Sequence, residues 1–131
     1  MFGLVSTDKA AFTKLLLVSG LSPEFLSVFD APAINGIIEN FIASTDWRPI
    51  GETIRVDLSL NVREYAARIK APALLITAKH GQIVPPAYSE NLVPEAKALE
   101  LDSGHLIFLE KPADLASAIL SFCQSQAGAV S

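Results

Sequence analysis

Ala73-Leu74-Leu75-Ile76-Thr77 decides the fold, because this run is apolar on both faces and has the length of one strand. A strand that is buried on both faces is typical of a parallel sheet. Lys97–Leu101 alternates between apolar and polar residues and predicts a second strand. The sequence between them predicts a loop over 79–86 and a short helix over 87–93. Strand, helix, strand with short connections indicates an α/β fold with a parallel sheet and crossover helices.

Helices are predicted on both sides of these strands. A short helix over 61–69 ends before Pro72, because proline disfavours a helical conformation in the residue that precedes it. After the second strand, 102–105 forms a turn, and 112–124 is an amphipathic helix with most of its apolar residues on one face.

The first half of the chain is predicted to be helical. Asp8 is a suitable N-cap for a helix over 9–19, and Ser22-Pro23 is typical of the start of the next helix. A third helix is predicted over 34–44 from its apolar spacing. The stretch Trp47-Arg48-Pro49-Ile50-Gly51 predicts a loop.

Composition restricts the classes of protein that fit. The length of 131 residues is typical of a single domain. With 50% hydrophobic and 18% charged residues, the composition favours a packed core over disorder. A net charge of -4 with a pI near 5.0 gives no basic surface for nucleic acid or an anionic membrane. The apolar runs are too short for a membrane span or a signal peptide, so we expect a cytoplasmic protein.

Few residues are suited to holding a metal. Cys123 is the single cysteine, which excludes an intramolecular disulfide and a multi-cysteine metal site. We expect it to be a core residue of the last helix rather than a nucleophile. The two histidines, His80 and His105, lack the spacing of metal ligands, and we expect neither a metal nor a cofactor.

Two predicted strands are too few for a complete sheet. Both edges would stay open, and no second layer would cover the faces. We therefore expect this chain to be part of a larger α/β domain, or to be completed by a second copy of itself or by a partner chain.

Four phrases in the second half resemble the C-terminal third of the α/β-hydrolase superfamily. These phrases are Ile69-Lys70-Ala71-Pro72-Ala73-Leu74-Leu75-Ile76-Thr77, Ile83-Val84-Pro85-Pro86, Leu101-Asp102-Ser103-Gly104-His105-Leu106 and Phe108-Leu109-Glu110-Lys111-Pro112. The resemblance covers residues 61–124 in order and spacing. Residues 1–60 resemble the helical cap of such proteins. The resemblance thus implies an incomplete α/β-hydrolase-like fold, with a cap-like region over 1–60 and a core segment over 61–131.

The resemblance assigns His105 as the catalytic base. A histidine in a glycine-flanked loop after a strand lies at the carboxyl edge of a parallel sheet, where open α/β sheets bind ligands. Its ordinary pKa also suits proton transfer near neutrality. His80, Trp47 and Leu106 are candidate substrate contacts. His80 could equally be an exposed loop residue, and Trp47 could equally be a packing residue among the phenylalanines of the first half.

The chain departs from the superfamily at the other two catalytic positions. Gly81 stands where the triad acid is expected, and Asp8 or Asp102 is left as an alternative acid, although Asp8 is also a good N-cap and Asp102 could simply cap or solvate its turn. No serine has glycine both two residues before and two residues after it, so the G-x-S-x-G nucleophile elbow is missing.

Three functions remain open. The first is a truncated hydrolase that keeps His105, whose family chemistry would be hydrolysis of a small apolar or acyl substrate such as an ester or lactone, and which is not competent alone. The second is a lyase, cyclase or isomerase that uses His105 to move a proton. The third is a binding module without chemistry. All three stay open because fold analogy alone does not determine function.

Overall fold

The computed structural model describes residues 2–89 and 91–128, which form two compact units. One unit contains the residues up to Ser19 together with Pro23–Asn61. The other contains Gly20–Ser22 together with the residues from Val62 onward. The short segment Gly20–Ser22 therefore belongs with the strands, although it lies between two helices of the first unit in the sequence.

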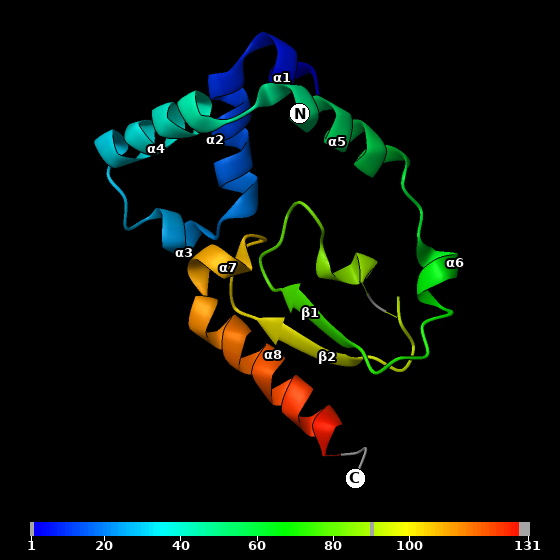
Figure 1. Ribbon diagram of the computed structural model, residues 1–131. Helices are drawn as coiled ribbons and strands as arrows, with labels where there is room; N and C mark the ends of the chain where they lie inside the picture. The colour runs from blue at the N-terminus through cyan, green and yellow to red at the C-terminus, as the bar shows by residue number, and fades with distance from the viewer. Residues whose placement is uncertain (1, 90, 129–131) are drawn as a thin grey trace. The chain divides into compact units, whose positions relative to one another are not determined.

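The first unit is helical (Figure 1). Its helices are α1 (Phe2–Thr7), α2 (Lys9–Gly20, whose last residue belongs to the second unit), α3 (Pro23–Leu26), α4 (Ala31–Ser44) and α5 (Trp47–Ser59). Helix α1 packs against α5. The buried apolar residues are Val5, Phe12 and Ile38, and the predicted helices over 9–19 and 34–44 are confirmed as α2 and α4.

Aspartates begin the two longer helices of this unit. Asp30 accepts a hydrogen bond from the Ala33 N–H at 2.8 Å, and Asp46 accepts one from the Arg48 N–H at 3.1 Å. The predicted loop over 47–51 is wrong, because α5 begins at Trp47. Pro49 lies in the first helical turn, where the missing N–H of proline is tolerated.

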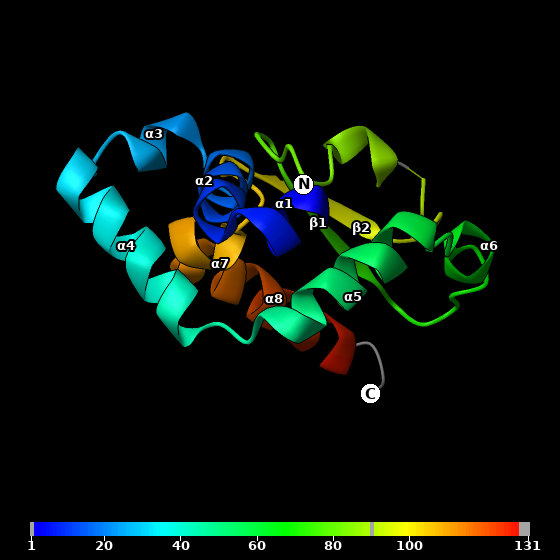
Figure 2. The same ribbon diagram turned by 90° about the horizontal axis from the view of Figure 1, so that it is seen from above.

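The second unit contains the sheet. Its elements are α6 (Arg63–Ala66), β1 (Leu74–Ala78), the 3₁₀ turn η1 (Pro86–Tyr88), β2 (Lys97–Leu101), α7 (Ile107–Glu110) and α8 (Pro112–Ala127). The strands are parallel, with Leu74 opposite Lys97 and Ala78 opposite Leu101. Figures 1 and 2 both show the two strands side by side. Both predicted strands are confirmed.

The crossover between the strands differs from the prediction. The helix expected over 87–93 is replaced in the described residues by the single turn η1, and residue 90 lies outside them. Pro86 lies at the start of η1, where proline is tolerated, whereas Pro94 disfavours a helical conformation at Val93, the last residue of the expected helix.

Helix α8 exposes much of the face that was expected to be core. Ile119 and Leu120 are 46% and 61% exposed, and Cys123 is an exposed free thiol. The prediction that Cys123 is a core residue is therefore wrong, because the described residues do not cover this part of the helix. None of the helices among the described residues is both long and apolar enough to span a membrane. The cytoplasmic location stays a prediction.

Candidate active site

His105 lies in the loop that leads from β2 into α7. The two strands are parallel, so the loops that follow them, 79–81 after β1 and 102–106 after β2, share one edge of the sheet. Backbone hydrogen bonds join these loops: the Lys79 N–H donates to the Leu101 carbonyl at 2.9 Å, and the His80 N–H donates to the Ser103 carbonyl at 3.0 Å. His105 and its neighbour Leu106 are half-buried, which leaves the imidazole accessible.

Glu110, the last residue of α7, fixes this loop. Its Oε1 accepts hydrogen bonds from the Gly104 N–H at 3.0 Å and from the Ser22 N–H at 2.8 Å. Its Oε2 accepts a bond from the Ser22 hydroxyl at 2.6 Å. The residue before His105 is thus tied to the carboxylate. The stretch Phe108–Pro112, which carries part of the family resemblance, includes Glu110, but the sequence alone did not indicate a role for it.

Gly104 has no space for a side chain. A Cβ at this position would lie 2.5 Å from the Ser22 nitrogen, and 2.6 Å from both Glu110 Oε1 and the Leu21 carbonyl carbon. Two of these three neighbours are backbone atoms, which cannot turn away. The glycine that precedes His105 is therefore required by the close approach of two segments, since its φ lies outside the positive region.

Asp102 is paired with the other histidine. Its Oδ1 lies 2.7 Å from His80 Nε2, and its Oδ2 lies 3.3 Å from Lys79 Nζ. An ionised carboxylate only accepts, so the Nε2 of His80 carries the shared hydrogen. The expectation that Asp102 only caps or solvates its turn is thus incomplete. In residues 2–89 and 91–128, no hydrogen bond joins a carboxylate to the His105 imidazole.

The pairing changes the titration of the carboxylate. The hydrogen bond from His80, followed by the hydrogen bond and positive charge of Lys79, holds the pKa of Asp102 below its usual range. The group is largely exposed, so the two loops are joined by a surface pair that salt would screen.

Asp8 and Trp47 belong to the first unit, and the structure gives each a local role. The apolar residues before Asp8 form α1 and not a strand, and the Asp8 carboxylate accepts from the Ala11 N–H at 2.8 Å. This N-cap explains Asp8 without a catalytic function. The Trp47 ring lies edge-on to Phe12 and Phe41 and near Lys9 Nζ, which are packing contacts. Its contact with a substrate stays a prediction, as do those of His80 and Leu106.

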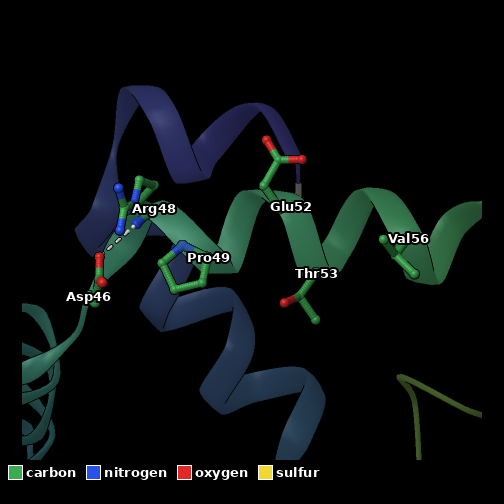
Figure 3. Close-up of a pocket in the computed structure, with 6 residues that line it drawn as sticks. All are labelled: Asp46, Arg48, Pro49, Glu52, Thr53 and Val56. Atoms are coloured by element: carbon green, nitrogen blue, oxygen red, sulfur yellow. Dashed lines mark hydrogen bonds between the residues drawn. The ribbon is translucent and has the colours of Figure 1, made fainter.

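A pocket of about 510 Å³ lies on α5 of the first unit (Figure 3). It is lined by Asp46, Arg48, Pro49, Glu52, Thr53 and Val56. All six come from one helix and its N-cap, and Asp46 is already engaged with the Arg48 N–H. The described part of the chain contains no cluster of three or more side chains that could hold a metal ion.

The parallel strands, the histidine loop after the second strand and the helical first half define the class of fold. It is an incomplete α/β-hydrolase-like fold, as the resemblance predicted. No protein-family model matches the chain.

Known proteins that are similar to it include a deacetylase and an enol-lactonase. A curated relative, the pyrrolizixenacetamide deacetylase of Xenorhabdus hominickii, is 34% identical over 126 residues, which are 94% of this chain and 47% of the relative. Among solved structures, the enol-lactonase from Burkholderia xenovorans LB400 aligns with a TM-score of 0.80 at 20% identity, over 94% of this chain and 48% of that one. The chain thus spans about half the length of each.

Proposed function

We propose that this chain is the cap and last-strand portion of an acyl hydrolase, and that His105 is its general base. In the reaction, His105 takes the proton of the attacking hydroxyl and returns it to the leaving group. The serine nucleophile and the oxyanion donors come from segments outside this sequence, since the chain has no G-x-S-x-G elbow. The chain alone is therefore not a competent hydrolase.

The observation that carries the proposal is the loop that presents His105. The loop follows a parallel strand, its imidazole is half-buried, and the backbone on its N-terminal side is held by Glu110. A loop tied down in this way suits a proton-transfer group, because general acid–base catalysis needs a base held within hydrogen-bonding reach of the reacting atom.

The substrate we propose is a small, largely apolar acyl compound, either an ester or lactone or an acetamide. The names of the two similar proteins support this class, since one is a deacetylase and the other an enol-lactonase. The open sheet supports a partner: a second copy of this chain or a different chain would supply the missing strands.

The test combines the chain with the polypeptide encoded immediately upstream, which we expect to carry the G-x-S-x-G elbow. The combined protein should be labelled by a fluorophosphonate on the upstream serine and should cleave p-nitrophenyl acetate. His105→Ala should lower kcat by about 10³-fold or more. Glu95→Ala, an exposed residue of the same unit, is the matched control. Full activity of the His105→Ala protein would refute the assignment, and labelling of the 131-residue chain alone would refute an outside nucleophile.

A second candidate follows from the missing acid. Asp102 is held by His80 and Lys79, and Gly81 stands at the usual acid position. A histidine without a carboxylate partner still moves protons in a lyase, cyclase or isomerase. This alternative predicts that the protein catalyses proton exchange or isomerisation of a bound substrate. The reaction should require His105 and should not require a serine that reacts with a fluorophosphonate.

A further inference from the structure

We propose that Glu110 is the positioning residue for His105, and that it acts by anchoring the loop on both sides of the imidazole. This inference rests on the proposed function for its catalytic meaning. Its physical basis is independent of that function, because it consists of contacts among Glu110, Gly104 and the Gly20–Ser22 segment within one unit.

The anchoring has two points. On the N-terminal side of His105, the Gly104 N–H donates to Glu110 Oε1 at 3.0 Å. On the C-terminal side, the Leu106 N–H donates to the Gly20 carbonyl at 2.8 Å. Glu110 also holds the Gly20–Ser22 segment, because it accepts both the N–H and the hydroxyl of Ser22. One carboxylate therefore controls both anchors, directly through Gly104 and indirectly through Ser22.

The geometry leaves little freedom for the loop. Ser22 is 6% exposed, Ser103 is fully buried, and a Cβ on Gly104 would collide with the Ser22 nitrogen. Water has poor access to donors packed this closely, so a hydrogen bond lost here is not fully replaced by one to water. Removing the carboxylate would break the bonds from the Gly104 N–H, the Ser22 N–H and the Ser22 hydroxyl at the same time.

The chemistry of the carboxylate makes clear predictions for three substitutions. Glutamine keeps Oε1 as an acceptor for both N–H groups, and the Ser22 hydroxyl can turn to accept from its amide. Aspartate is shorter by one methylene and cannot reach both Ser22 and Gly104. Alanine accepts nothing. The loop should therefore be retained in Glu110→Gln, weakened in Glu110→Asp and released in Glu110→Ala.

Amide hydrogen exchange and imidazole NMR on the full 131-residue chain test this order. Glu110→Ala should raise the exchange rates of the Gly104 and Leu106 amides by about tenfold or more, and should move the His105 imidazole resonances. The Lys97 and Ala66 amides, which donate to Ala73 and Val62, are the internal references and should change by less than about twofold. Glu95→Ala is the matched control, and Glu110→Gln should restore the native pattern.

Three results would overturn the proposal. The first is faster exchange at Gly104 with unchanged Leu106 exchange and unchanged His105 resonances. The second is an equal rise at all amides of the unit in both the alanine and the glutamine variants, which marks a general structural role. If Glu110→Ala does not fold, Glu110→Gln is compared with Glu110→Asp, and equal behaviour of these two is the third.

The test of Glu110 and the test of the proposed function can fail independently of each other. Exchange and imidazole shifts need no turnover, so a negative result here leaves the acyl-hydrolase proposal intact, and a lack of fluorophosphonate labelling leaves the positioning result intact. Where the combined protein is active, Glu110→Ala should lower kcat by about tenfold with KM nearly unchanged, since the base and not the substrate site is displaced. Glu110→Gln should recover most of that loss.

Discussion

At Gly104 the space is set by backbone atoms of a neighbouring segment, so substitution there has a direct cost. We predict that Gly104→Ala lowers the free energy of unfolding by about 1–3 kcal/mol, because the added methyl overpacks the contact with Leu21 and Ser22. Gly128→Ala in the same unit is the control, since its nearest neighbour is at 3.9 Å and its φ of -72° suits alanine. Urea denaturation measures both, and equal midpoints would contradict the prediction.

Asp102 joins the two loops through its contacts with His80 and Lys79. Its folded pKa is lowered, first by the hydrogen bond from His80 and then by Lys79, so the pair stabilises the fold above the ordinary pKa of an aspartate. That contribution is lost as the pH falls through the lowered pKa. We predict a carboxyl ¹³C titration midpoint for Asp102 below about 3.9. In His80→Ala the midpoint should rise toward the ordinary value, with Lys79 still holding it down.

The control for this titration is Glu95→Ala, a substitution at an exposed residue of the same unit outside both loops, which should leave the Asp102 midpoint unchanged. High salt should also raise the Asp102 midpoint, since the pair is exposed. An Asp102 midpoint at or above the ordinary value in the native protein would show that the pair does not form in solution.

At the scale of elements, α5 depends on its first residues. Asp46 caps the helix through the Arg48 N–H, and Pro49 occupies the first turn. We predict that Asp46→Ala lowers the stability of the first unit by about 1 kcal/mol and reduces the helical far-UV CD signal. Asp57→Ala in the last turn of the same helix is the control, since a negative charge there is unfavourable to the helix dipole. Equal losses in both variants would exclude the cap as the cause.

The local sequence pattern predicted a helix or strand correctly where it pointed to a single conformation. The continuous apolar run of β1 and the alternation of β2 fixed both strands within one residue. In 47–51, Pro49 and Gly51 suggested a loop, whereas the cap at Asp46 and the packing of Trp47 make the segment helical. The His105 loop was predictable from its flanking residues. The role of Glu110 was not, because its partner Ser22 is 88 residues away in the chain.

At the scale of the whole molecule, the described residues form a two-stranded sheet to which they add no further strand. β2 carries the exposed charges Lys97 and Glu100, which are typical of a strand at the edge of a sheet, whereas β1 carries none. We therefore expect additional parallel strands to pair with the free edge of β1. This arrangement would place β1 inside the sheet, as expected for a strand with an apolar sequence. The His105 loop would follow β2, the edge strand, and would be accessible to a reacting group from outside this sequence.

Association should follow from this incompleteness. Exposed apolar side chains on α7 and α8, among them Phe108 and Leu120, add to the open sheet, so burying them in a second copy is favourable. We predict that the purified chain sediments above its 14.0 kDa monomer mass at micromolar concentration. Leu120→Gln should shift the distribution toward monomer, while Ser121→Gln, at an exposed polar position one residue away, should not. A stable, folded monomer would contradict the inference, since it would mean that two strands and their helices suffice without a partner.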